Sequence, residues 1–288
     1  MRVEAKPGVF ACGDHLIKLT CSCVGESMTQ SSSLFEYDQA GPVDVRYAGE
    51  RKSSDYTIQN LTFLTPFGYR RAAYLVKPRG KGPFPAILYA HWLETCAPNA
   101  NRTQFLPEAQ EMARRGVVSL LVETMWSDQD WFIKRTQSED RENTVRQVIE
   151  LRKAMDLLFR QGEVDPARFA LTGHDFGAMV GIMAGDVDRR PKAYALMAPT
   201  SRFSDWYLYY PPVEKETDQK TFVQSLAPFD PVAHIGSLGP APILLQFGRQ
   251  DPHVPEERAA ELVEAAPRTA EIRWYEAGHE LNEQAAEE

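Results

Sequence analysis

The sequence predicts an α/β fold built on a mainly parallel, twisted sheet of about eight strands flanked by helices. From about residue 54, short apolar runs alternate with amphipathic helical stretches, which is typical of such a sheet. The apolar runs are nearly continuous, as expected of strands that are buried on both faces. With 288 residues and 43% hydrophobic content, the chain is long enough for one large domain.

The expected elements can be placed in order along the chain. Two runs joined at Phe67 and Gly68 predict an antiparallel hairpin, and six more strands follow it. The expected strands are 56–66, 69–78, 84–91, 116–123, 168–175, 193–200, 241–248 and 271–278. Helical spacing of apolar residues predicts helices over 107–116, 142–162 and 255–266. We expect residues 54–288 to form the main domain and residues 1–53 an N-terminal arm of uncertain order, which could also be a contact in a homodimer.

Charge and composition exclude several classes of partner. The net charge of −8 and the pI of about 5.4 argue against binding to nucleic acid. No run is apolar and long enough for a membrane span or a signal peptide, so we expect a cytoplasmic protein without a membrane partner. The four cysteines form no zinc pattern with the scattered histidines, so we expect reduced thiols, no metal and no cofactor.

The stretch "FALTGHDFGAM", residues 169–179, predicts a sharp turn from a buried strand into a helix. Gly173 and Gly177 provide the small neighbours that such a turn needs, and the residue at its centre is strained. That residue is Asp175. The turn lifts its side chain above the sheet edge, where parallel sheets bind their ligands.

Two later strand ends supply partners for this carboxylate. Asp251 follows the penultimate strand in "ILLQFGRQDPHVP", and His279 follows the last strand in "IRWYEAGHEL". The chain order of nucleophile, acid and histidine is the order of the α/β-hydrolase triad. Asp175, Asp251 and His279 are therefore the candidate catalytic residues.

Residues 54–282 resemble the α/β-hydrolase superfamily, particularly its dienelactone-hydrolase-like branch. The stretches "VDPARFALTGHDFGAM", "APFDPVAHIGSLGPAPILLQFGRQDPHVP" and "WYEAGHEL" carry this resemblance. It implies an α/β-hydrolase catalytic domain with Asp175 as nucleophile, Asp251 as acid and His279 as base, and a short lid inserted after the sixth strand. The nucleophile of that branch is Cys or Ser, whereas an aspartate in "GHDxG" is similar to epoxide hydrolases and haloalkane dehalogenases.

An aspartate suits displacement at an sp³ carbon better than attack on an ester. Attack on an ester carbonyl gives a mixed anhydride, and the tetrahedral intermediate expels the carboxylate again because it is the better leaving group. With an alkyl halide or an epoxide, Asp175 would instead become an alkyl ester. His279 could then deprotonate the water that hydrolyses this ester, while Asp251 orients the imidazole.

Both steps need hydrogen-bond donors. The backbone N–H of Phe176 and the segment "YAHWLET", with His91 and Trp92, are candidates for holding an oxyanion. Trp92 is also a candidate donor to a leaving halide. For an epoxide, an acidic O–H could come from Tyr207, Tyr209 or Tyr210 in "SRFSDWYLYYPP".

The substrate pocket is expected to be rich in aromatic side chains. Trp126 and Trp131 lie in the loop after the fourth strand, Trp206 lies in the insertion, and Glu94 follows His91 closely. These residues favour a small-molecule substrate with an apolar body.

Two alternatives to this mechanism are open. The first is a hydrolase of carboxylic esters or lactones in which Asp175 acts as a general base. The second is a non-catalytic binding protein on the same fold, because a fold does not prove an activity.

Overall fold

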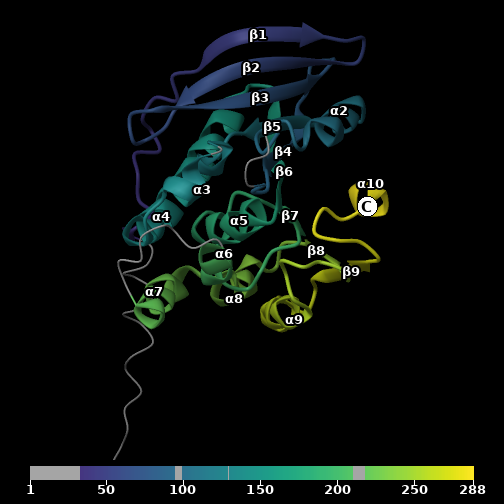
Figure 1. The fold of residues 1–288 in the computed structure, drawn as a ribbon. Coiled ribbons are helices and arrows are strands. Elements are labelled where there is room, and N and C mark those ends of the chain that lie inside the picture. Colours follow the sequence, from purple (N-terminus) through teal and green to yellow (C-terminus); the bar gives the residue numbers. More distant parts are fainter. Residues whose placement is uncertain (1–32, 95–98, 129, 210–217) are drawn as a thin grey trace, which may run out of the picture.

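The sheet predicted from the sequence is present and has nine strands. The computed structural model describes residues 33–94, 99–128, 130–209 and 218–288. The strand order is β1-β2-β3-β5-β4-β6-β7-β8-β9. Strands β1, β2, β3 and β5 pair antiparallel with their neighbours, whereas β5, β4, β6, β7, β8 and β9 run parallel. The fold is therefore α/β with a mostly parallel sheet, and the expected hairpin is formed by β2 and β3 (Figure 1).

The elements have the following bounds. The strands are β1 (Arg46–Lys52), β2 (Tyr56–Leu64), β3 (Arg70–Pro78), β4 (Phe84–Ala90), β5 (Val118–Val122), β6 (Val164–His174), β7 (Ala193–Met197), β8 (Ile243–Gly248) and β9 (Glu271–Tyr275). The α-helices are α2 (Leu106–Arg114), α3 (Trp131–Lys134), α4 (Gln137–Phe159), α5 (Phe176–Val187), α6 (Phe203–Tyr209), α7 (Gln219–Leu226), α8 (Pro231–His234), α9 (Glu256–Ala265) and α10 (Glu283–Glu287).

Strand β1 is the one strand of the nine that was not among the eight strands expected from the sequence. It lies inside the segment expected to be an arm and pairs antiparallel with β2. All seven of its residues are exposed, so it lacks the apolar pattern that marks the other strands. Upstream of β1, Phe35 and Val43 are buried in the main core.

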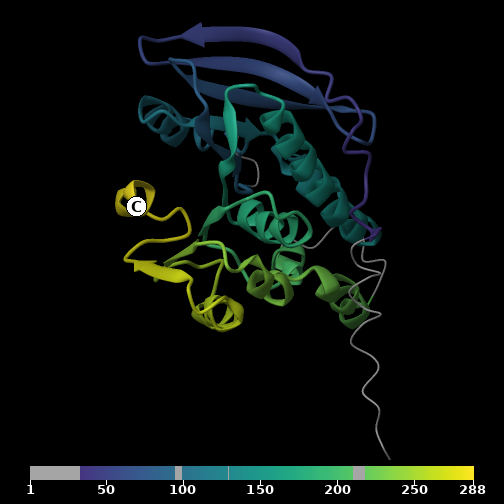
Figure 2. The same ribbon diagram turned by 180° about the vertical axis from the view of Figure 1, so that it is seen from behind.

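The helices lie on both faces of the sheet (Figure 1). Helices α4, α5 and α8 cover one face, and α2 and the short α10 lie on the other; Figure 2 shows the same arrangement from behind. Helix α5 is the most enclosed, because Phe176 to Gly185 are all buried. Among the described residues, no helix has both the length and the apolar character needed to cross a bilayer.

The insertion after β7 holds α6 and α7 among its described parts. Residues 210–217, which separate these two helices, lie outside the described residues. Phe203 and Tyr207 of α6 are buried in the main core, and Phe222 and Leu226 of α7 are buried as well. That this insertion acts as a lid stays a prediction.

Close backbone packing fixes the turn between β6 and α5. A Cβ atom placed on Gly177 would lie 2.0 Å from the carbonyl oxygen of Ala90 in β4, and one on Gly173 would lie 2.5 Å from the carbonyl oxygen of Gly177. Neither contact can relax by a change of side-chain rotamer, because both obstacles are backbone atoms. The helix can therefore approach the strand ends only with glycine at these positions.

We expect Gly177→Ala to destabilise the protein by several kcal/mol, on the order of an overpacked core substitution or more. The free energy of unfolding, measured by urea denaturation, would show the loss. Gly162→Ala is the matched control, since a Cβ there meets no atom within 4 Å. Equal stability of the two variants would contradict the close-packing argument.

Candidate active site

Asp175 stands between β6 and α5 in a strained backbone conformation. Its φ of 54° and ψ of −122° are rare for a residue other than glycine. Its backbone N–H donates to Met197 O of β7 at 2.8 Å, and its carbonyl accepts from Met179 N of α5 at 3.0 Å. These bonds hold the turn predicted from the two glycines and direct the Asp175 side chain to the end of the sheet.

Asp251 and His279 meet beside this turn. Asp251 Oδ2 lies 2.7 Å from His279 Nδ1, and Asp251 Oδ1 accepts from the backbone N–H groups of His253 at 2.8 Å and Val254 at 3.0 Å. The loops after β8 and β9 are in close contact, because a Cβ on Gly248 would lie 2.3 Å from the carbonyl oxygen of Gly278. The structure thus fixes the orientation of the imidazole.

The two carboxylate oxygens of Asp175 have different surroundings. Oδ2 accepts from the backbone N–H of Leu93 at 3.0 Å, and the backbone N–H of Phe176 also acts to lower the pKa of this carboxyl group. Oδ1 lies 3.8 Å from His279 Nε2, and both atoms are buried without a hydrogen-bond partner among the described residues. One oxygen is therefore held by amides, and the other faces the imidazole.

Burial and neighbouring charges shift the pKa values of Asp175, His279 and Asp251. Burial raises the pKa of the fully buried Asp175 to about 7, although His279 and the two backbone amides act in the opposite direction. Burial alone would lower the pKa of His279, but the hydrogen bond to Asp251 and the charges of Asp175 and Asp251 raise it overall. Burial would raise the pKa of Asp251, and the contacts with His279 more than offset this effect.

A cavity of about 260 Å³ ends at His279, and Asp175 and Asp251 lie behind its wall. Its lining consists of Trp92, Leu93, Glu94, Trp206, His253, His279 and Glu280. The Trp206 ring stacks on His253 at 5.3 Å and lies 5.6 Å from the His279 ring. Trp206 is 5% exposed, and its indole Nε1 has no partner among the described residues. This indole N–H is therefore a donor without a partner on a residue of the cavity wall.

Glu94 and Trp206, predicted for the substrate pocket, and Trp92, predicted as a hydrogen-bond donor, line the cavity. The predicted residues His91, Trp126 and Trp131 do not line it. His91 is buried behind the site, where its Nε2 lies 2.9 Å from Ser127 Oγ and from Thr124 Oγ1. Trp126 is also buried, and its indole N–H donates to His91 O at 3.2 Å. Trp131 packs against Phe132.

The tyrosines expected to act as acids do not line the cavity where they are described. Tyr207 is 1% exposed, and its O–H lies 3.0 Å from Thr144 Oγ1 at α4. Tyr209 is 53% exposed, and its ring contacts the outer side of Trp206 and His253. Tyr210 lies outside the described residues. Tyr207 does not reach the cavity because the helical turn of α6 directs Trp206 to the site and Tyr207 into the core.

Three residues of the site were not identified from the sequence. Leu93 takes part through its backbone N–H, which leaves no mark on the side-chain pattern. His253 lies two residues after Asp251 and forms part of the cavity wall. His174 Nε2 lies 2.8 Å from His279 O, and burial lowers the pKa of this histidine to about 3, so it is neutral at pH 7. The stretches "DPHVP" and "GHDFG" contained both histidines, and their proximity to the predicted triad was the available signal.

Comparison with known protein families identifies the family of this chain. The model of the prolyl oligopeptidase family matches residues 103–281, which include Asp175, Asp251 and His279. The chain belongs to the prolyl oligopeptidase family. It is therefore a hydrolase of the α/β-hydrolase type. A comparison with curated proteins found no match.

Solved structures share the fold of this prolyl oligopeptidase family member at low sequence identity. Acetyl xylan esterase 1 from Thermoanaerobacterium sp. JW/SL YS485 has a TM-score of 0.71 and 15% identity over 90% of each chain. Acetyl xylan esterase from Paenibacillus sp. R4 has a TM-score of 0.68 and 16% identity over 87% of each chain. The esterase domain of a Rhodothermus marinus protein has a TM-score of 0.59 and 21% identity, and the match covers 80% of this chain and 92% of that one.

The described residues of this family member contain no group of three or more His, Cys, Asp or Glu side chains placed to hold a metal ion.

We expect Asp175→Asn to be more stable than the wild type at pH 8. Because the folded-state pKa of Asp175 is raised to about 7 from 3.8, its ionisation opposes folding. The stability difference should grow between about pH 4 and pH 7 and level off at about 2 to 4 kcal/mol. Urea denaturation at several pH values would measure it.

Asp55→Asn, which changes an exposed aspartate, is the control for this series. A lower stability of Asp175→Asn at pH 8 would show that the buried carboxylate stabilises the fold. That result would contradict the raised pKa of Asp175.

Proposed function

We propose that this hydrolase forms a covalent alkyl ester at Asp175 with substrates that carry a leaving group on an sp³ carbon. The observation that carries this proposal is the position of Asp175 Oδ2, which accepts a hydrogen bond from the amide of Leu93 at 3.0 Å. Asp175, His279 and Asp251 would act as nucleophile, base and orienting acid. The family and its fold support a hydrolase, and the oxygen positions at the site favour this reaction.

The Leu93 amide favours an ester formed on the protein over an ester brought by the substrate. In acyl transfer, the substrate carbonyl oxygen needs such amides when it becomes an oxyanion. Here Asp175 Oδ2 already accepts from the Leu93 amide. After alkylation of Oδ1, the same Oδ2 becomes the carbonyl oxygen of the new ester. The hydrolytic step would then place its negative charge where the Leu93 N–H already points.

The proposed reaction has two balanced steps. In the first, Asp175 Oδ1 forms a bond to the substrate carbon, and the leaving group departs with the bonding electrons as an anion. In the second, His279 Nε2 takes a proton from water as the oxygen attacks Asp175 Cγ, and the charge collects on Oδ2. Collapse breaks the Cγ–Oδ1 bond and releases the alcohol, which receives the proton from His279. The second proton of the water then leaves Asp175 for the solvent, which regenerates the carboxylate. Asp251 holds the imidazole and stabilises its charged form.

The described donors favour an alkyl halide over an epoxide. An epoxide oxygen needs a proton, but the O–H of Tyr207 contacts Thr144, and Tyr209 lies outside the cavity. The indole N–H of Trp206 can donate a hydrogen bond but gives up no proton, which suits a leaving group that is stable as an anion. We therefore propose a halide or a similarly weak base as the leaving group, on a substrate with an apolar body.

Ester or lactone hydrolysis, with Asp175 as a general base, is the second candidate. The names of three structural neighbours favour it, since two are acetyl xylan esterases and one is an esterase domain. In this reaction Asp175 would form no bond to the substrate. Membership of the dienelactone-hydrolase-like branch and the domain division at residue 54 stay predictions. The family favours an enzyme over a non-catalytic binding protein.

We expect His279→Gln to accumulate an adduct on Asp175 when it is incubated with 1-bromohexane. Glutamine cannot take the proton from water, so alkylation proceeds and hydrolysis stops. Intact mass spectrometry would show one added hexyl group, and peptide mapping would place it on Asp175. The double variant Asp175→Asn/His279→Gln is the control and should remain unmodified. Ester cleavage by the wild type without any adduct in His279→Gln would contradict the proposal and favour the second candidate.

We expect Trp206→Phe to slow the turnover of 1-chlorohexane by about tenfold, the effect of one lost hydrogen bond in the transition state. The loss should be smaller for 1-iodohexane, because iodide needs less stabilisation as it leaves. Single-turnover rates of alkylation would measure both. Trp131→Phe, outside the cavity, is the matched control. An equal loss for both halides would show that Trp206 acts only through packing.

A further inference from the structure

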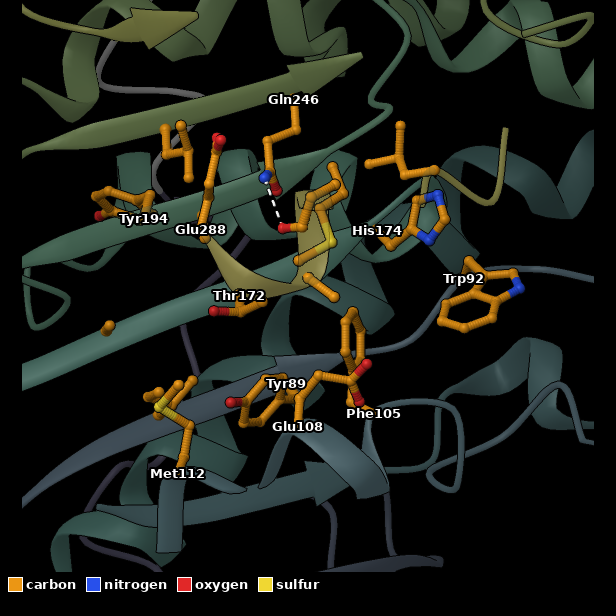
Figure 3. A pocket seen from close by; sticks show the side chains of 18 of the residues that line it. Tyr89, Trp92, Phe105, Glu108, Met112, Thr172, His174, Tyr194, Gln246 and Glu288 are labelled. Carbon is orange, nitrogen blue, oxygen red and sulfur yellow. Dashed lines mark hydrogen bonds between the residues drawn. The ribbon is translucent and has the colours of Figure 1, made fainter. Parts of the chain in front are cut away.

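A second cavity, of about 310 Å³, lies against the face of the sheet that carries α2 and α10 (Figure 3). Its floor is formed by β4, β6, β7 and β8. The side chains at its centre are small, with Ala170 on β6 and Ala193 and Ala195 on β7, and all three are only half-buried. Larger side chains at these positions would fill the space. The cavity is therefore present because the strands carry alanine where buried strands usually carry Val, Ile or Leu.

Helix α10 closes one side of this cavity. Gln246 Nε2 of β8 donates to Ala285 O at 2.8 Å, the dashed line in Figure 3, and to Tyr275 Oη at 2.9 Å. Asn282 caps the helix by accepting from Ala285 N at 3.1 Å. These bonds fix the short helix over the sheet edge and leave the space between it and α2 unfilled.

An aromatic cluster forms the wall on the α2 side. The Phe105 ring lies 5.1 Å from the Tyr89 ring and 5.7 Å from the Trp92 ring, and the latter pair meets edge to face. Tyr89 and Phe105 are each 4% exposed, so their packing is fixed. Such clusters of ring faces attract organic cations. Figure 3 shows Tyr89, Phe105 and Glu108 close together at this wall.

Glu108 provides a negative charge beside the rings. Its Oε2 is buried and has no hydrogen-bond partner among the described residues. Burial also raises the pKa of this carboxyl group. A buried carboxylate oxygen without a partner is costly, and a bound cation would reduce that cost.

The other charges of the lining have the same sign. Glu280 and Glu288 line the cavity, and its described lining contains no lysine or arginine. Glu288 is already engaged, because it accepts from Tyr275 Oη at 2.7 Å and lies 3.4 Å from Arg273 Nε. His174, also in the lining, is neutral at pH 7. The cavity therefore combines an apolar floor with acidic groups that no basic side chain of the lining balances.

We propose that this cavity binds an organic cation with an apolar body, such as an alkylammonium ion, with its charged head between Glu108 and the rings of Tyr89, Trp92 and Phe105. The alkyl part would lie over the alanines of β6 and β7. The site is separate from the cavity at His279, although Trp92 and Glu280 line both. Binding here does not depend on the chemistry at Asp175.

Isothermal titration calorimetry with hexyltrimethylammonium tests the proposal. The wild type should bind it saturably and should bind 1-hexanol and hexanoate much more weakly. Glu108→Gln keeps the size of the side chain and removes its charge, so it should weaken binding about tenfold. Glu111→Gln is the matched control on the same helix, because Glu111 is outside the lining and paired with Arg114 and Arg115. It should bind like the wild type.

A second variant locates the binding site. Ala195→Leu places a larger side chain on the floor and should abolish binding, while an unchanged circular dichroism spectrum would show that the fold is intact. Equal affinity for hexyltrimethylammonium and 1-hexanol, or full affinity in Glu108→Gln, would overturn the proposal and indicate a neutral apolar site. Undiminished binding to Ala195→Leu would place the ligand elsewhere and overturn it as well. The same measurements on Asp175→Asn should match the wild type, which separates this result from the proposed reaction.

Discussion

The hydrogen bond from the Leu93 backbone to Asp175 Oδ2 organises the site more than any other contact. It joins the end of β4 to the start of α5 and selects which carboxylate oxygen faces His279. It forms only because Gly177 lets α5 approach Ala90 O of β4. Strain at Asp175, close packing at Gly177 and the choice of reactive oxygen are thus parts of one arrangement.

The electrostatics of the site follow from the same burial. A carboxyl group with no exposed surface resists ionisation, and the amides and His279 only partly compensate. Asp251 balances the imidazole from the other side, with its own charge held by His279 and by two backbone N–H groups. Two carboxylates, those of Asp251 and Asp175, therefore lie on either side of the His279 imidazole. This arrangement is typical of functional sites.

The sheet supports two different environments at its edge and on its face. At the carboxyl ends of β6, β8 and β9, the loops bring ionisable side chains into contact with one another. On the face between α2 and α10, alanines and the short C-terminal helix leave an apolar space with Glu108 at its wall. Trp92 separates the two spaces, since its ring contacts Phe105 on one side and it lines the cavity at His279 on the other.

The sequence by itself determined the α/β fold, the parallel strands, the turn at Asp175 and the strand ends that carry Asp251 and His279. These features depend on local patterns, namely apolar runs and glycine spacing, that the chain shows directly. Only the tertiary structure decided that β1 joins the sheet, that the Leu93 amide holds Asp175, and that Trp206 rather than Tyr207 faces the site. A backbone donor leaves no side-chain signature, an exposed edge strand lacks an apolar pattern, and the orientation of a short helix depends on what packs against it.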